Sequence, residues 1–196
     1  MANPIVIRSS MRSAGLIAAG SATRILLTPV VMWLVLNGED ESSELIAAAL
    51  FCLAAATDWV DGRLARRWGV TSKLGSFLDT TADKLLVSGV LIALLDVGRA
   101  SAWIVAVIIG RELLVMALRG VLASEGEVMA PSMLGKLKTS IQFLAIALAI
   151  LRPGEPIAGL YLDEWVMLAA AAITVASAID YLMRALPEVA REDRRP

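Results

Sequence analysis

Histidine is missing from the chain, and cysteine occurs once, at Cys52. Without imidazole, metal ligands and proton acceptors have to come from Asp, Glu, Lys or Tyr side chains. A single cysteine excludes both an intrachain disulfide and a cysteine metal cluster, so we expect Cys52 to be a small apolar residue inside a helix. The N-terminal region also lacks a short apolar core followed by a small-residue cleavage site, which predicts no removable signal peptide.

Hydrophobic residues, in contrast, make up 58% of the 196 residues, and the mean hydropathy is +0.72. Soluble domains are about 45–50% apolar, so this composition is typical of an integral membrane protein. The apolar stretches lie at about 25–36, 45–57, 85–95, 102–118, 140–151 and 165–183. Several reach the ~20 residues of a membrane span only when the polar residues at their ends are included.

We therefore predict an all-α membrane protein with six transmembrane helices in a single domain over residues 1–196. Residues 1–20 are expected to form a helix at the membrane interface, and residues 188–196 a charged tail. The predicted turns are marked by glycine and proline, at Asn37-Gly38, Gly69, Gly98 and Pro153-Gly154.

The positive charges of the predicted loops are distributed unevenly. Of the 18 Lys and Arg residues, only Arg99 and Arg152 fall on one side of a six-span threading, and the other 16 fall on the side of both termini. Because cytoplasmic loops carry an excess of Lys and Arg, both termini are predicted to be cytoplasmic.

Four aspartates within 26 residues form the strongest chemical signal, Asp58, Asp61, Asp79 and Asp83. Their spacings of three and four residues place the two members of each pair on one helix face. Placing an ionisable side chain in or near a membrane segment costs free energy, so each of these aspartates is a candidate functional residue. Neighbouring carboxylates repel one another unless hard cations neutralise them, and an all-oxygen site suits Mg²⁺ or Mn²⁺. The pattern predicts a site for one or two such ions, which take phosphate oxygens of a substrate as further ligands.

The residues between the two pairs suit a phosphate ester. Gly62 and Gly75 have no side chain and let a ligand approach the backbone. Ala65 keeps the same face narrow, and Arg66 can bind a phosphate through two parallel hydrogen bonds. The alternative is a solvated loop with ordinary charge pairs, which explains single residues but not the whole pattern.

That pattern, D-x2-D-G-x2-A-R-x8-G-x3-D-x3-D, resembles the signature of the CDP-alcohol phosphatidyltransferases. The matching residues are Asp58, Asp61, Gly62, Ala65, Arg66, Gly75, Asp79 and Asp83. The resemblance implies a six-helix enzyme, usually dimeric, in the plasma membrane of a bacterium. It also implies transfer of a phosphatidyl group from CDP-diacylglycerol to an alcohol, with release of CMP and no nucleic-acid partner.

The resemblance assigns roles residue by residue. Asp58, Asp61 and Asp79 would hold two metal ions, and Asp83 would be a further ligand and the catalytic base. The CDP pocket would be lined by Asp61, Gly62, Ala65, Arg66 and Gly75.

Several cations near the cytoplasmic ends of the fourth and fifth predicted helices indicate a phosphorylated acceptor, namely Arg111, Arg119, Lys136 and Lys138. A neutral acceptor would not need them. The alternative is that they follow the positive-inside rule and attract anionic lipid. That alternative fits Arg111 less well, since it lies within an apolar stretch with only Glu112 beside it. We expect these charged residues to line a polar cavity that opens to the cytoplasm. Two further charged residues are expected in this cavity, the cation Arg24 and the anion Glu112.

Shorter elements resemble the family members that use sn-glycerol 3-phosphate as acceptor. They are A-x2-T-D-W-x-D-G, A-D-K, G-R-E, A-L-R and G-K-x-K-T-x2-Q. We therefore expect Mg-dependent transfer to sn-glycerol 3-phosphate. The chain departs from these family members at one segment. They often carry N-x-L-T-x2-R before the first helix, whereas this chain reads A-A-G-S-A-T-R over residues 18–24. Arg24 keeps its place, and the Asn-Leu-Thr part is absent.

Other functions stay open. Within the family, the acceptor could be inositol phosphate or phosphatidylglycerol, whereas the cations argue against serine. Outside the family, the aspartates could form the binding site of a divalent-cation transporter. The outer half of the predicted bundle is nearly free of charge, which argues against a polar path across the membrane.

Overall fold

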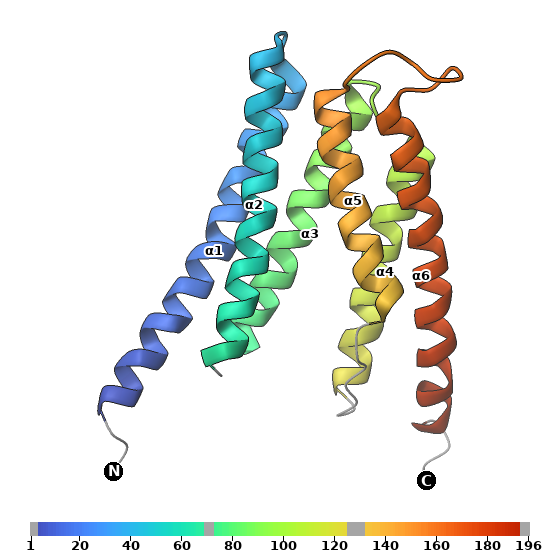
Figure 1. The fold of residues 1–196 in the computed structure, drawn as a ribbon. Coiled ribbons are helices and arrows are strands. Elements are labelled where there is room, and N and C mark those ends of the chain that lie inside the picture. Colours follow the sequence, from blue (N-terminus) through green and yellow to red (C-terminus); the bar gives the residue numbers. More distant parts are fainter. Residues whose placement is uncertain (1–3, 69–72, 125–131, 193–196) are drawn as a thin grey trace. The chain divides into compact units, whose positions relative to one another are not determined.

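The computed structural model describes residues 4–68, 73–124 and 132–192, and the side chains of residues 20–57, 78–124 and 132–186. Its elements are the helices α1 (Pro4–Asn37), α2 (Glu41–Trp68), α3 (Lys73–Asp96), α4 (Ala102–Ser124), α5 (Met133–Leu151) and α6 (Leu162–Glu192) (Figure 1). The predicted all-α class with six helices is confirmed, and each predicted apolar stretch lies inside one helix. The chain divides into two compact units, residues 1–97 and 98–196, each with three helices.

In the first unit, α1 packs against both α2 and α3. The buried residues recur every three or four positions, as expected of one helix face. On α2 they include Ala47, Phe51 and Ala54, and on α3 they include Ala82, Leu86, Val90 and Leu94. The small residues on α2 allow helix backbones to approach closely, which is the usual way in which helices associate in a membrane.

The contacts between α1 and α3 show that these two helices run in the same direction. Arg24 on α1 pairs with Asp79 on α3. Further along both helices, Thr28 and Met32 lie against Gly89. If successive helices cross the membrane in alternating directions, the first and third helices have to be parallel, as they are here.

The predicted ends of the chain differ in detail from the structure. α1 is one helix of 34 residues, so the expected interfacial helix over residues 1–20 continues directly into the first apolar stretch. No proline interrupts the chain between Pro4 and Pro29, and the glycines there are tolerated inside a helix at a modest cost. At the other end, α6 continues to Glu192, which shortens the expected tail of residues 188–196.

The turn between α1 and α2 is where Asn37-Gly38 predicts it. A side chain at Gly38 would bring a Cβ within 2.5 Å of the Leu34 carbonyl oxygen, so the turn requires glycine. Asp40 then caps α2, because its Oδ1 accepts hydrogen bonds from the backbone N–H and the hydroxyl of Ser43. These hydrogen bonds lower the pKa of the Asp40 carboxyl below its ordinary value.

In the second unit, α6 packs against both α4 and α5. Val115 and Leu122 of α4 form a buried cluster with Tyr181 and Ala185 of α6. Arg111 contacts Ser177 and, further along both helices, Arg119 lies over the Tyr181 ring, so α4 and α6 also run in the same direction. The buried residues of α5 include Ala145, Ile146, Ala149 and Ile150.

Charged residues hold together the loops at one end of this unit. Arg152 adopts a left-handed conformation (φ 39°) at the C-terminus of α5, as residues that end helices often do. Its guanidinium lies 3.3 Å from the Glu164 carboxylate and 4.2 Å from the centre of the Tyr161 ring. Arg99 follows the predicted turn at Gly98 (φ 71°) and donates to the Ile150 carbonyl oxygen at 2.6 Å.

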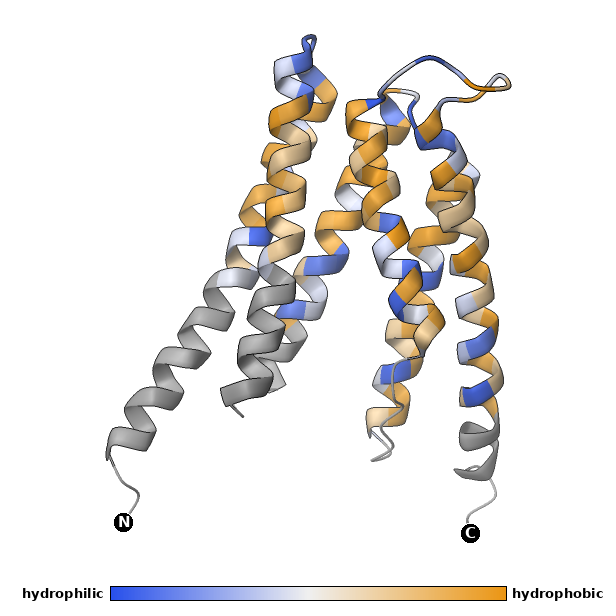
Figure 2. Cartoon of the chain, viewed as in Figure 1, coloured by the Kyte–Doolittle hydropathy of each residue, from blue (hydrophilic) through white to orange (hydrophobic). Residues whose placement is uncertain are grey.

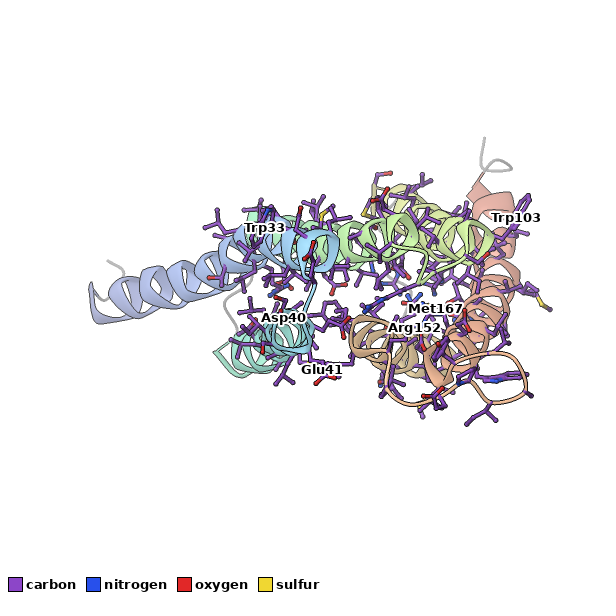
Figure 3. All side chains as sticks on the ribbon, turned by 90° about the horizontal axis from the view of Figure 1, so that it is seen from above. Trp33, Asp40, Glu41, Trp103, Arg152 and Met167 are labelled. Atoms are coloured by element: carbon purple, nitrogen blue, oxygen red, sulfur yellow. The ribbon has the colours of Figure 1, made fainter. Side chains whose placement is uncertain are left out.

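Many large apolar side chains of the described helices are exposed. Figure 2 shows that hydrophobic residues predominate along these helices. Trp103, for example, is 83% exposed and projects outward (Figure 3). Within the described part of the chain, α1, α5 and α6 are long and apolar enough to cross a membrane, over Gly20–Asn37, Met133–Leu151 and Leu162–Leu186. The chain is thus a membrane protein, while the expectation that all six helices span the bilayer stays a prediction.

The contact at Gly89 generates a test of the α1–α3 packing. A Cβ there would lie 2.9 Å from both Met32 Sδ and Thr28 Cγ2. We expect Gly89→Ala to destabilise the protein by about 1–3 kcal/mol, because Thr is stiff and cannot move aside. The measurement is the midpoint of thermal unfolding in detergent. Gly120→Ala is the matched control, since no atom lies within 4 Å of its Cβ and alanine favours a helix. Equal midpoints for the two variants would contradict the predicted close packing.

Candidate active site

The predicted aspartates lie on the two helices joined by the 69–72 segment. Asp58 and Asp61 lie in the C-terminal part of α2, and Asp79 and Asp83 lie in the first half of α3. Both pairs of aspartates therefore lie inside helices, as their spacings of three and four residues predict. Among the other residues of the motif, Gly62, Ala65 and Arg66 belong to α2, and Gly75 belongs to α3. The side chains of this motif before residue 78 are outside the described ones, so the convergence of all four carboxylates stays a prediction.

Asp79 is held by two donors from α1. Arg24 Nη2 donates to Asp79 Oδ1 at 2.8 Å, and Ser21 Oγ lies 3.3 Å from the same oxygen. Arg24 is fully buried, whereas the Asp79 side chain is 32% exposed. Since both contacts use Oδ1 and a third of the side chain is open, the carboxylate can present its other oxygen to a ligand. This geometry fits a metal-binding aspartate whose orientation is fixed by its neighbours.

Ser21 contacts the candidate ligand Asp79 but was not among the residues predicted from the sequence. It belongs to the segment over residues 18–24 that departs from the N-x-L-T-x2-R pattern. In that pattern, the threonine stands three positions before the arginine, which is the place of Ser21. The hydroxyl is therefore kept although the residue type differs, and this spacing is the signal from which the contact could have been predicted.

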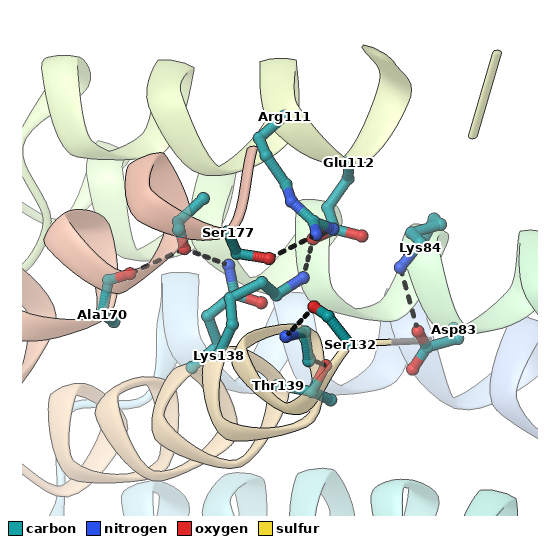
Figure 4. A network of polar contacts seen from close by, with 12 residues as sticks. Asp83, Lys84, Arg111, Glu112, Ser132, Lys138, Thr139, Ala170 and Ser177 are labelled. Atoms are coloured by element: carbon teal, nitrogen blue, oxygen red, sulfur yellow. Dashed lines mark hydrogen bonds and ion pairs between the residues drawn. The ribbon is translucent and has the colours of Figure 1, made fainter. Parts of the chain in front are cut away.

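Asp83 lies one helical turn beyond Asp79 on α3, so the two share a helix face. Its Oδ2 is 3.5 Å from the Lys84 ammonium, and both side chains are partly exposed (Figure 4). Among the residues whose side chains are described, no three His, Cys, Asp or Glu come together as a metal-binding group. Two of the four predicted ligands lie outside that set.

The second unit contains a buried charge cluster made of Arg111, Glu112, Lys138 and Ser177 (Figure 4). The Lys138 ammonium on α5 donates to Glu112 Oε1 on α4. Arg111 Nη1 lies 3.3 Å from the same Oε1, and Arg111 Nη2 donates to Ser177 Oγ on α6 at 2.8 Å. The cluster thus joins all three helices of this unit, and it brings together two of the four predicted acceptor cations.

The other two predicted cations have separate surroundings. Arg119 is exposed on α4, with its guanidinium carbon 5.5 Å from the centre of the Tyr181 ring. Lys136 is exposed in the first turn of α5, which is capped by the Ser132 hydroxyl accepting from the Gly135 N–H. The structure therefore divides the acceptor set into a buried part and an exposed part.

A second polar contact between α5 and α6 involves Gln142, whose Nε2 donates to Thr174 Oγ1 at 3.2 Å. The Thr174 hydroxyl in turn donates to the Ala170 carbonyl oxygen at 2.6 Å. Neither Thr174 nor Ser177 stands out in the sequence, because single hydroxyl residues are common in membrane helices.

Comparison with known proteins places these residues in a family. A sequence model of the CDP-alcohol phosphatidyltransferases matches residues 19–181. The chain is 47% identical over 139 residues to the CDP-diacylglycerol–glycerol-3-phosphate 3-phosphatidyltransferase of Bacillus subtilis, covering 65% of this chain and 72% of that protein. It is 38% identical over 167 residues to the enzyme of the same name from Escherichia coli, covering 83% of this chain and 90% of that protein.

A third relative matches nearly the whole chain. The probable phosphatidylglycerophosphate synthase of Mycobacterium tuberculosis is 35% identical over 186 residues, covering 93% of this chain and 87% of that protein. The family match contains the complete aspartate motif, Arg24 and the charge cluster of α4, α5 and α6. The chain is a phosphatidyltransferase that belongs to the CDP-alcohol phosphatidyltransferase family.

Proposed function

We propose that the chain transfers the phosphatidyl group of CDP-diacylglycerol to sn-glycerol 3-phosphate, giving phosphatidylglycerophosphate and CMP. The observation that carries this proposal is the complete aspartate motif on α2 and α3, with Asp79 held by Arg24. The names of the Bacillus subtilis and Escherichia coli relatives, which state both substrates, support the choice of acceptor.

The metal site of this proposal consists of Asp58, Asp61, Asp79 and Asp83, which would hold two Mg²⁺ or Mn²⁺ ions. When bound, the ions supply Lewis-acid neutralisation of charge on the pyrophosphate oxygens. The contacts of Asp79 support the assignment, because a ligand carboxylate whose orientation is fixed by a buried arginine loses little freedom on binding. The cytidine and phosphate groups of the donor are assigned to Asp61, Gly62, Ala65, Arg66 and Gly75.

The acceptor phosphate is assigned to Arg111, Arg119, Lys136 and Lys138. In the reaction, the 1-hydroxyl of glycerol 3-phosphate attacks the β-phosphorus of CDP-diacylglycerol, and its proton passes to Asp83. A new P–O bond forms as the bond to the CMP oxygen breaks, and CMP leaves with the bonding electrons. Little covalent chemistry falls to the protein, so positioning and electrostatic stabilisation carry the rate.

The proposal extends to the setting of the enzyme. We place it in the plasma membrane of a bacterium as a homodimer, with both termini and the aspartates on the cytoplasmic side. The distribution of Lys and Arg supports this orientation, and the bacterial relatives support this location.

The first test is CMP release by the purified protein in detergent with CDP-diacylglycerol and Mg²⁺. Glycerol 3-phosphate, inositol phosphate, serine and phosphatidylglycerol are added singly. We expect release with glycerol 3-phosphate alone and its loss when EDTA removes the metal. Release with a different acceptor would overturn the assigned substrate. No release with any acceptor, together with Mn²⁺ uptake into proteoliposomes, would favour the transporter instead.

A second test addresses the base. Asp83→Asn keeps the size of the side chain but cannot accept the proton, so kcat should fall by about 10²–10⁴-fold. Binding of CDP-diacylglycerol, followed by isothermal titration, should change much less. Asp96→Asn is the matched control, since it makes the same change at the exposed far end of α3 and should leave kcat unaltered. Full activity of Asp83→Asn would refute the assignment of the base.

A further inference from the structure

The four cations assigned to the acceptor phosphate differ in burial. The side chains of Lys138 and Glu112 are only 3% and 4% exposed, whereas that of Arg111 is 11% exposed. A ligand that enters from outside the helices can therefore contact Arg111 more readily than the ammonium of Lys138. Lys138 is better placed to act on a ligand through its neighbours.

Two cations, Lys138 and Arg111, contact the same carboxylate oxygen of Glu112. Lys138 makes a direct ion pair with Glu112 Oε1. Arg111 lies 3.3 Å from that oxygen, at the long end of a hydrogen bond, and makes its shorter contact, 2.8 Å, with Ser177 Oγ. The guanidinium is thus only weakly held by the carboxylate, and its firm anchor is a neutral hydroxyl.

These contacts matter for an anionic ligand. A buried carboxylate beside Arg111 competes with a phosphate for the same guanidinium, because both bind it through charged hydrogen bonds. Among the described residues of this cluster, Lys138 neutralises the carboxylate, so the two cations and one anion have one net positive charge. Without Lys138, Glu112 and Arg111 would neutralise each other and no charge would remain for the ligand.

We propose that Lys138 is a positioning residue, which pairs with Glu112 and thereby keeps Arg111 available as the phosphate-binding residue for the acceptor. This inference rests on the proposed function and deepens it, because it changes the part of Lys138 from direct contact with the acceptor phosphate to positioning of Arg111. The ligand it implies is a small phosphate monoester, and the contact residue in the cluster is Arg111. On this proposal, the charge of Glu112 makes phosphate binding by Arg111 dependent on Lys138.

A double-mutant cycle separates this role from direct contact. Lys138→Met leaves the Glu112 charge to Arg111, so the KM for glycerol 3-phosphate should rise about ten-fold or more. Adding Glu112→Gln removes the competing carboxylate. The double variant should therefore return to within a few-fold of the wild-type KM, although it still lacks the ammonium. The KM for CDP-diacylglycerol should stay unchanged throughout.

Direct contact of Lys138 with the phosphate predicts the opposite. In that case, the double variant would keep the raised KM of Lys138→Met, and that result would overturn the proposal. An unchanged KM for Lys138→Met would overturn it as well. If Lys138→Met does not fold, the charge-neutral double variant alone decides, since a near-normal KM supports the proposal and a ten-fold rise contradicts it.

A control accounts for general damage to the second unit. Thr174→Val breaks the buried contact with Gln142 on the neighbouring helix without altering any charge. It should lower the thermal midpoint in detergent and leave both KM values unchanged. If Lys138 had only a structural role, Lys138→Met would give this same result.

The wild-type assay separates this inference from the proposed function. Absence of CMP release with glycerol 3-phosphate rejects the function, whereas an active enzyme without rescue rejects only the role of Lys138.

Discussion

A charge inside an apolar helix needs a counter-charge within reach, and two ion pairs between described helices meet that constraint. Arg24 is fully buried on α1 and pairs with Asp79 on α3, and Glu112 on α4 pairs with Lys138 on α5. Each pair joins two helices of its unit, so residues that we propose for the chemistry also hold helices together. Removal of one partner from such a pair is costly where the remaining charge is buried, as for Arg24, Glu112 and Lys138. Variants of these residues should therefore be tested for stability as well as for activity.

The two pairs differ in what they leave available. In the first unit, the arginine is enclosed and the carboxylate is partly open, which suits a residue that binds cations. In the second unit, the carboxylate and the lysine are both enclosed, and the partly open group is Arg111, which suits a residue that binds anions. The two clusters therefore differ in which charged group is partly exposed, a carboxylate in the first unit and a guanidinium in the second.

Much of the fold could be predicted from the sequence, because apolar stretches between Gly and Pro turns leave few alternatives to membrane helices. The continuity of α1 through residue 20 could not, since no residue there forces a break or forbids one. The placement of the aspartates on two helices was predictable, because their charges and spacing stand out in an apolar sequence. The site was less predictable where side-chain direction decides: Lys136 and Lys138 are two residues apart, so they point about 200° apart on a helix. One is exposed and the other buried, although the sequence reasoning gave them one role.

Ser21 and Arg24 come from the same face of α1 and bind the same oxygen of Asp79. The two bonds cannot be broken independently by a movement of the helix, because a rotation of α1 about its axis carries both donors away together. The orientation of the carboxylate is therefore coupled mechanically to the rotational setting of α1. α1 carries none of the proposed metal ligands, yet its rotational setting governs the orientation of one of them, Asp79.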